Sequence, residues 1–543
     1  MIILFGLLFL VRIFGLNLNF YSDETVFALE AKDGFKNFSK VVSEHPPLPI
    51  FLYSLFGEAF GNSNFAIRLV PFTFAMLSIL LTYFLAKEIF DKKTALASAI
   101  VMAVSFWHTL ATLQVDIDGS ILTFMFLAAF FCYIKFEKTK ERTWIFITGI
   151  FFGLSLLTKL PGILVFPILG LYALFSRKNF KDILWHFFVI GLIGTGVFFG
   201  GMGLSYLAGF NLFDSILEHT NGAVSLKISF LPLIYILIWG TPLLVFTPFL
   251  SFGKFKKEHI LFAVWCIVPL FFYLFAGIPG LSPFDRYLMI LIPALSILAG
   301  NYIGENFDTK CFKRLFFSGA VFFVLIFVLN INPDYVAHNL GSYVSNILNL
   351  KWNFYFPITG SSGAMFGMNF ASIAIGYFIG GVLFLFLILN KFREYVLPVF
   401  LGLVFAFNIF MVQELAFHAA NPDFNKAITD VSDYFVEHKL PYPIYTNQFS
   451  YLYYLNLESE YHTSLRQTDK FFWFSYDARD YSQNYFNFSD KFDNMIKSKE
   501  GTILLVDFPI MDKNSEFWKA INLCRNTKTF YSKGFPVGYV FEC

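Results

Sequence analysis

The sequence carries few charged residues for its length. Of its 543 residues only 14% are charged, whereas 57% are hydrophobic and the mean hydropathy is +0.61. A soluble domain has about 25% charged residues, and a single soluble core stops growing near roughly 250–300 residues. So much apolar chain predicts a protein that uses lipid as its solvent. The net charge of +2, with no basic domain, argues against a nucleic-acid partner.

Cysteine is also scarce. The five cysteines form no CxxC motif and no Cys/His cluster, which argues against a metal site of that type. Cys524 and Cys543 are the two in the polar C-terminal segment, and they can pair if that segment lies outside the cytoplasm. The N-terminus lacks the basic region and cleavage site of a secretory signal. We therefore expect the apolar run from Met1 to begin a retained membrane helix.

Long apolar runs recur along the chain as far as residue 413. A spanning helix needs ~20 mostly apolar residues, so the runs predict a polytopic α-helical membrane protein with about thirteen spans. The short pair 144–158 and 162–176 fits either two tilted helices or a re-entrant pair. The runs are 1–20, 66–86, 94–113, 119–135, 144–158, 162–176, 184–207, 230–250, 260–276, 286–303, 314–331, 369–389 and 395–413.

Lys and Arg alternate between two sets of connecting loops. One set of short loops holds 18 of them, whereas the longer loops of the opposite set hold 8. Basic residues favour the cytoplasmic side, so the first set is predicted to be cytoplasmic. The N-terminus is then on the cytoplasmic side of the cell membrane. After an odd number of spans, the C-terminal segment is on the outer side.

That C-terminal segment has a composition of its own, rich in Asp, Asn, Lys and Tyr. Residues 424–438 form an amphipathic stretch, and 443–446, 502–508 and 537–541 have the pattern of strands. We therefore predict two domains, a transmembrane domain over 1–413 and a small extracytoplasmic α/β domain over 414–543.

The predicted outer loops hold ionisable groups beside apolar helices, where such groups are costly and tend to mark function. Asp23 or Glu24 can take a proton from an acceptor hydroxyl, although Asp23 can also simply begin a helix. Asp116 and Asp118 fit a binding site or a polar turn. The remaining candidates are the cations Lys159 and Arg286, which suit a phosphate or membrane headgroups, and His45, which precedes two prolines in a possible rigid turn.

One further cation lies inside the first apolar run. Arg12 is surrounded by apolar residues in the sequence, and an arginine in lipid needs a partner such as a carboxylate or a polar loop. We therefore expect the fold to supply one.

Taken together, these motifs resemble one superfamily. The chain reads SDETVFALEAKDGF after the first helix, EHPPLPIFLYSLFGEAFGNSNFAIRLVPF before the second, and GLSLLTKLPGILVFP after the fifth, with RYLMILIPAL near the tenth. This set is similar to the protein O-mannosyltransferases and aminoarabinose (lipid A) transferases, which have the GT-C fold. The resemblance is good over residues 1–180, moderate to about 300 and weak beyond.

The resemblance implies roles for the candidate residues. Asp23 matches the general base, Glu24 a neighbour that shapes the acceptor site, and Asp118, rather than Asp116, the second acidic motif. Lys159 and Arg286 match positions expected on the donor phosphate. The family usually has Lys-Gly-Pro where this chain has Lys159-Leu160-Pro161, so its loop backbone can differ.

The resemblance also implies a reaction. A sugar on a polyprenyl or dolichyl phosphate would pass to a hydroxyl of a protein, lipid or glycan on the outer face, with inversion. No essential metal is implied, yet related oligosaccharyltransferases use a divalent cation that Asp23, Asp116 and Asp118 would also suit, so the sequence leaves metal open. The rival hypothesis is a transporter or flippase of lipid-linked saccharides. Such proteins often have broken helices in both halves, and the sequence indicates one interruption, at 159–162.

Overall fold

The structure is a computed structural model of the chain. It describes residues 9–34, 46–176, 179–208, 230–251, 256–275, 285–358, 365–389, 392–457, 470–473, 498 and 500–543. His45 lies outside this part of the chain.

The chain divides into two compact units. The helical unit comprises Met1–Leu16, Glu30–Val324 and Gly376–Val412, and the mixed unit comprises Asn17–Leu29, Leu325–Ile375 and Gln413–Cys543. The mixed unit thus takes in two earlier segments besides the C-terminal one. The domain boundary predicted at 413/414 stays a prediction.

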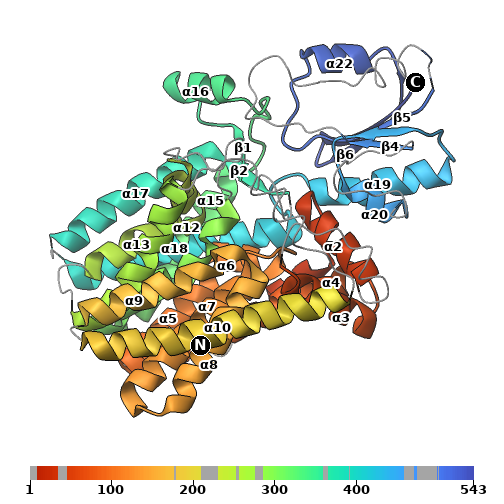
Figure 1. The fold of residues 1–543 in the computed structure, drawn as a ribbon. Coiled ribbons are helices and arrows are strands. Elements are labelled where there is room, and N and C mark those ends of the chain that lie inside the picture. Colours follow the sequence, from red (N-terminus) through yellow and green to blue (C-terminus); the bar gives the residue numbers. More distant parts are fainter. Residues whose placement is uncertain are drawn as a thin grey trace. The chain divides into compact units, whose positions relative to one another are not determined.

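Helices account for most of the described chain (Figure 1). Polar side chains begin several of them: Ser63 accepts from the amide of Ala66 at 3.2 Å and Asp91 from that of Thr94 at 2.7 Å. Four helices, α2, α15, α17 and α18, are divided between the two units. The helices up to α18 are α2 (Asp23–Gly34), α3 (Leu48–Phe60), α4 (Asn64–Ile89), α5 (Lys92–Val104), α6 (Phe106–Leu113), α7 (Ser120–Thr139), α8 (Arg142–Thr158), α9 (Val165–Phe175), α10 (Phe180–Leu207), α12 (Leu231–Ser251), α13 (Ile260–Phe275), α14 (Ile292–Asn306), α15 (Phe312–Leu329), α16 (Leu340–Leu348), α17 (Phe370–Ile388) and α18 (Arg393–Phe417).

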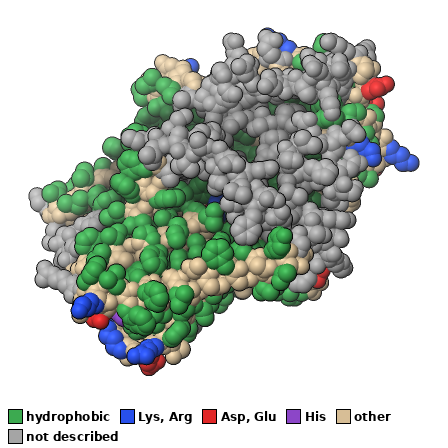
Figure 2. All heavy atoms as spheres, viewed as in Figure 1, with side chains coloured by type: hydrophobic (Ala, Val, Ile, Leu, Met, Phe, Trp, Pro, Cys, Tyr) green, Lys and Arg blue, Asp and Glu red, His purple; other side chains and the backbone are tan. Residues whose placement is uncertain are grey.

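Many of these helices are long and apolar enough to cross a membrane. Within the described residues there are eight, or nine if the bent pair α5 and α6 is one span. The helices α8 and α9 are shorter apolar helices, as their short runs predicted. Figure 2 shows hydrophobic side chains over much of the described helical surface, with Lys and Arg gathered at one end. The chain is a multi-pass membrane protein, and the count of about thirteen spans stays a prediction.

Two of the apolar helices are interrupted, in addition to the break at 159–162. A bend of 62° separates α5 from α6 at Ser105, and α12 is kinked at Thr241, whose φ is 52°. Asn408 of α18 forms a hydrogen bond at each break. Its Oδ1 accepts from the amide of Phe106 at 2.8 Å, and its Nδ2 donates to Thr241 Oγ1 at 2.9 Å. A break in a buried helix frees backbone groups, and this amide side chain satisfies part of that need.

Arg12 finds its partners at the first of these breaks. Its guanidinium donates to the carbonyl of Ala103 at 2.7 Å, in the last turn of α5, and lies 3.4 Å from His108 Nδ1. The last carbonyls of a helix lack intrahelical partners and carry negative partial charge. A helix end is therefore one partner of this buried cation.

A mixed five-stranded sheet, ordered β4-β3-β5-β7-β6, organises the C-terminal part of the mixed unit. The strands β3, β4 and β5 are parallel, whereas β7 pairs antiparallel with β5 and β6. The sequence indicated β3, β5 and β7 but not β4 or β6. The elements are α19 (Phe424–Glu437), β3 (Ile444–Thr446), α20 (Ser450–Tyr454), β4 (Phe471–Trp473), β5 (Thr502–Val506), α22 (Glu516–Ile521), β6 (Arg525–Ser532) and β7 (Phe535–Glu542), and a separate pair is β1 (Tyr355–Pro357) with β2 (Gly367–Asn369).

Alternate residues of the strands face two different hydrophobic cores. Leu504 and Val540 pack with α19 on one face, whereas Ile503 and Phe541 pack with α22 on the other. Figure 1 shows these two helices on opposite sides of the sheet. The first core also includes Tyr21 from the N-terminal segment of the mixed unit.

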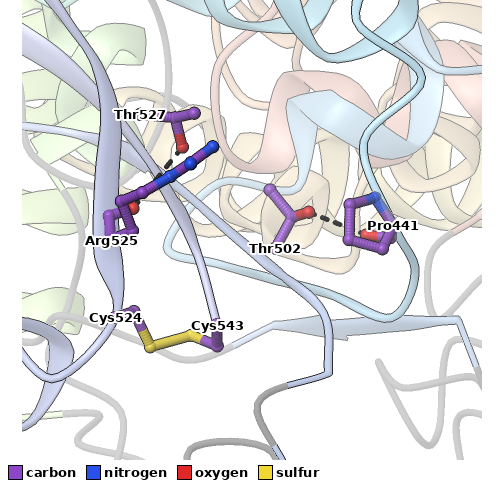
Figure 3. Close-up of a disulfide and its surroundings, with 6 residues drawn as sticks. All are labelled: Pro441, Thr502, Cys524, Arg525, Thr527 and Cys543. Atoms are coloured by element: carbon purple, nitrogen blue, oxygen red, sulfur yellow. Dashed lines mark hydrogen bonds between the residues drawn. A yellow bond between two sulfur atoms is a disulfide. The ribbon is translucent and has the colours of Figure 1, made fainter.

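The two tail cysteines form the predicted disulfide (Figure 3). Cys524 directly precedes β6 and Cys543 directly follows β7, and their Cα atoms are 4.4 Å apart. Arg525 pairs in the sheet with Glu542, and their side chains form an ion pair at 3.0 Å. The bond therefore ties together the open ends of the β6–β7 hairpin.

An ion pair between a buried carboxylate and a partly exposed lysine closes the loop after β5. Asp507 is fully buried, and its Oδ2 lies 2.6 Å from Lys513 Nζ and accepts from the Tyr539 hydroxyl at 3.3 Å. Its Oδ1 accepts from the Met511 amide at 2.8 Å. Burial raises the pKa of Asp507, and Lys513 opposes that shift. The carboxylate thus depends on Lys513 for its charge balance.

Lys513→Met should destabilise the protein, because it leaves the Asp507 carboxylate buried without its cation. The lysine is partly exposed, so we expect about 1–3 kcal/mol rather than the full cost of breaking a buried pair. Thermal unfolding of the full chain measures the loss. The exposed Lys528→Met is the control and should unfold like wild type, and adding Asp507→Asn to Lys513→Met should recover stability. Equal stability of Lys513→Met and Lys528→Met would contradict the ion pair's role.

Candidate active site

Three segments of the helical unit position charged side chains at one buried site. Asp116 and Asp118 come from the loop between α6 and α7, and Lys159 stands between α8 and the 3₁₀ helix η3 (Leu160–Leu164). Arg286 belongs to the 3₁₀ helix η6 (Asp285–Leu291), which leads into α14. Four of the residues predicted from sequence therefore lie in three separate breaks between helices.

The acidic loop is held by its own backbone and by two neighbouring helices. Asp116 Oδ1 accepts from the Gly119 amide at 2.7 Å, and a Cβ on Gly119 would lie 2.8 Å from that same oxygen. The hydroxyl of Tyr53, on α3, donates to the Asp116 carbonyl at 2.6 Å. The buried guanidinium of Arg68, on α4, donates to the carbonyl of Leu113 at the end of α6. The loop backbone thus has specific partners from both sides.

Asp118 is the centre of the charged cluster. Its Oδ2 lies 2.6 Å from Lys159 Nζ and 3.4 Å from Arg286 Nε. The exposed fractions of the three side chains are only 1%, 11% and 7%. Burying a charge is costly unless it is paired, and here two cations share one carboxylate. The cluster therefore places two cations against one carboxylate.

Asp116 is a second carboxyl group beside this cluster, and its pKa is shifted. Burial, together with the charge of Asp118, raises the pKa of Asp116 to about 7. A substantial fraction of Asp116 is therefore neutral near pH 7. Asp116 Oδ2 and Asp118 Oδ1 are both buried and have no hydrogen-bond partner among the described residues. The arrangement suits an anion that also carries hydroxyl groups, because hydroxyls can donate to these two oxygens.

Two tyrosines lie beside the cluster. Lys159 Nζ is 4.0 Å from the centre of the Tyr287 ring, a cation–π contact. The Tyr273 ring, from α13, stacks on Tyr287 with centres 5.4 Å apart and 29° between the planes. The site therefore combines charge with an aromatic wall.

The turn that presents Lys159 requires a glycine. The Lys159 amide donates to the Ser155 carbonyl at 3.0 Å, and the Gly162 amide donates to the Lys159 carbonyl at 2.8 Å. Ser155 Oγ donates to the Gly162 carbonyl at 3.2 Å. A Cβ on Gly162 would lie 2.4 Å from backbone atoms of Ser155, which is closer than any allowed contact. Gly162 lets η3 fold against the end of α8.

Asp23 and Glu24 belong to the mixed unit and open α2. Glu24 is completely buried, and its Oε2 accepts from the Tyr21 amide at 3.1 Å, which fixes the start of the helix. Asp23 is half-buried, and burial together with the charge of Asp23 raises the pKa of Tyr21 to about 12. His45 lies outside the described residues. The catalytic roles predicted for Asp23 and Glu24 stay predictions.

Sequence reasoning identified the charged residues of the cluster but missed three tyrosines. Tyr287 had a signal, because it adjoins Arg286 in the quoted motif. Tyr53 and Tyr273 had none, since each lies in an apolar helix of a chain with 27 tyrosines. A search of the described residues finds no group of three or more His, Cys, Asp or Glu that could hold a metal ion.

The chain resembles known proteins in sequence. Residues 44–199 match the model of the family described as dolichyl-phosphate-mannose-protein mannosyltransferase. An uncharacterized protein of Aquifex aeolicus is 27% identical over 271 residues, which cover 49% of this chain and 61% of that protein. The dolichyl-phosphate-mannose–protein mannosyltransferase 2 of Candida albicans is 26% identical over 190 residues, covering 28% and 25%. The chain thus spans less than two thirds of either relative.

The fold resembles a solved membrane protein over nearly the whole chain. ArnT from Cupriavidus metallidurans aligns at 16% identity over 99% of this chain and 97% of its own, with a TM-score of 0.59 in the apo state. The structure of the same protein bound to undecaprenyl phosphate gives a TM-score of 0.60. The chain therefore has the same fold as this ArnT. Within it, residues 44–199 carry the sequence pattern of the mannosyltransferase family.

Gly162→Ala should disrupt the Lys159 turn, because its new methyl group meets backbone rather than a flexible side chain. We expect a loss of about 1–3 kcal/mol or more in stability, measured by thermal unfolding of the full chain. Gly196→Ala, in the middle of α10 with nothing within 4 Å, is the control. It should leave stability unchanged or raise it by about 0.5–1 kcal/mol. Indistinguishable unfolding of the two variants would show that the turn tolerates a side chain.

Proposed function

We propose that the protein is a membrane glycosyltransferase that moves a sugar from a polyprenyl or dolichyl phosphate to an acceptor hydroxyl. The observation that carries this proposal is the buried sharing of Asp118 by Lys159 and Arg286. The positive charge of Lys159 and Arg286 suits a phosphate, which leaves when the sugar is transferred. The unpartnered oxygens of Asp116 and Asp118, among the residues described, suit sugar hydroxyls.

The comparisons support a lipid-linked donor. The description of the matched family names dolichyl phosphate mannose. The ArnT structure of the same fold holds undecaprenyl phosphate. A lipid carrier is also the donor that a membrane site can reach where no nucleotide sugar is available. We extend the donor class to this chain and leave the sugar and the acceptor, whether protein, lipid or glycan, unassigned.

In the proposed reaction Asp23 accepts the proton of the acceptor hydroxyl. The acceptor oxygen then attacks the anomeric carbon, and the bond from that carbon to the phosphate oxygen breaks. Lys159 and Arg286 stabilise the charge that develops on the leaving phosphate. A single displacement inverts the anomeric configuration. Glu24, whose carboxylate holds the Tyr21 amide, keeps the first turn of α2 in place.

We place the reaction on the outer face of the cell membrane, with the N-terminus in the cytoplasm and the C-terminal segment outside. The alternation of basic loops supports this orientation. The Cys524–Cys543 disulfide supports it independently, because such bonds persist in oxidising compartments and are rare in the cytosol.

Substitutions should separate the proton acceptor from the phosphate site. Asp23→Asn keeps the size of the side chain but accepts no proton, so transfer should fall ~10²–10⁴-fold with donor binding retained. Lys159→Ala and Arg286→Ala should instead weaken donor binding by about tenfold or more, since each removes a charged hydrogen-bond donor. Transfer from radiolabelled polyprenyl-phosphate sugars, and binding of undecaprenyl phosphate, measure the two effects on purified protein.

Asp433→Asn, on the exposed side of α19, is the matched control for Asp23→Asn and should keep full activity. Near-normal transfer by Asp23→Asn would move the base to Glu24 or Asp118. If none of the three site variants loses transfer but all lose movement of lipid across the bilayer, the flippase hypothesis replaces the transferase.

The raised pKa of Asp116 predicts a pH effect on donor binding. Below about 7 the carboxyl is mostly neutral, and as the pH rises through that value it adds a negative charge beside the phosphate. Wild-type affinity should therefore fall, by about tenfold, relative to Asp116→Asn between roughly pH 6 and 8. The ratio of the two Kd values for undecaprenyl phosphate removes the titration of the ligand itself. A ratio that is constant with pH would contradict titration of Asp116 in the site.

A further inference from the structure

Tyr273 has a buried hydroxyl that the fold does not use. The residue lies near the end of α13, and only 4% of it is exposed. Within the described part of the chain its hydroxyl makes no hydrogen bond. Burying a hydroxyl without a partner costs about 1–3 kcal/mol, and a phenylalanine would fill the same space without that cost. Packing alone therefore does not explain the hydroxyl, and a contact with a ligand would.

The surroundings of Tyr273 place it in the charged site. Its ring stacks on Tyr287, and the ammonium of Lys159 lies over the ring of Tyr287. The charge of Asp118 also acts on the Tyr273 hydroxyl. Tyr273 thus packs on Tyr287, and Tyr287 in turn contacts Lys159 of the candidate site.

The charges nearby select the kind of partner. Lys159 and Arg286 both lie against Asp118, so two cations occupy this cluster. A phenol O–H beside such a cluster is best satisfied by an anionic oxygen, to which hydrogen bonds are about twice as strong as to a neutral one. A phosphate offers such oxygens.

We infer that Tyr273 donates a hydrogen bond from its hydroxyl to the phosphate of the lipid carrier. This inference rests on the proposed function and names a further contact for its donor. Since the phosphate stays on the carrier after transfer, the contact exists with the sugar-free carrier too. Tyr273 would then affect the affinity for the carrier before it affects any acceptor.

Tyr273→Phe tests the contact, because it keeps the ring stacking and removes only the hydroxyl. The full chain in detergent should bind undecaprenyl phosphate about 10–100-fold more weakly, the value of a hydrogen bond to a charged group. Without ligand the variant should be as stable as wild type or more stable, since an unpartnered hydroxyl is gone. Tyr133→Phe, which removes a phenol from a buried position on α7, is the control and should bind normally.

Undecaprenol, which lacks the phosphate, separates the alternatives. Its binding should be the same for wild type and Tyr273→Phe, and an equal loss for both lipids would overturn the inference in favour of a contact with the isoprenoid chain. If wild type binds undecaprenyl phosphate and Tyr273→Phe binds it equally well, the inference fails while the proposed function stands. If wild type binds no undecaprenyl phosphate, the proposed lipid-phosphate donor itself fails.

Discussion

The site depends on one carboxylate that two cations share. Asp118 draws Lys159 from the α8–η3 junction and Arg286 from η6, so one ion cluster joins three breaks between helices. In a buried environment of low dielectric these charges attract one another strongly. Removing any one of them would leave another buried charge with less compensation for its desolvation. The turn at Gly162 and the loop held by Tyr53 matter because they deliver charges to this cluster. The same pairing that holds the segments together places two cations in one buried site.

Much of the helical architecture follows from the sequence because lipid imposes a simple demand. Backbone groups in hydrocarbon must be satisfied within the helix, so long apolar runs such as 184–207 become helices such as α10. The breaks at Ser105 and Thr241 were not predicted, since Asn408, far away in sequence, accepts from the Phe106 amide at one and donates to the Thr241 hydroxyl at the other. Similarly β6, whose residues are all exposed or half-buried, forms a strand because it pairs with β7. Such features depend on tertiary partners that no local pattern reveals.

The candidate site divides in the same way. Its charged residues were identifiable because a charge at the end of an apolar helix is costly and therefore conspicuous. Asp116, Asp118, Lys159 and Arg286 all met that description, and the structure brings them together in one unit. The tyrosines were not conspicuous, because aromatic residues make up 21% of the chain and most of them only pack. What distinguishes Tyr273 is the lack of a partner for its hydroxyl in the described structure, which is a property of the fold.

Buried polar atoms without partners connect stability to binding in this site. Asp116 Oδ2, Asp118 Oδ1 and the Tyr273 hydroxyl are unpartnered among the residues described, and each such atom lowers the stability of the fold. Two of them need a donor and one needs an acceptor. A sugar phosphate carries hydroxyl donors and phosphate acceptors within one small group, and its negative charge suits the two cations. The unpartnered atoms that lower the stability of the fold are thus the ones with which a lipid-linked sugar would form hydrogen bonds. A binding site can in this way have function at the expense of stability.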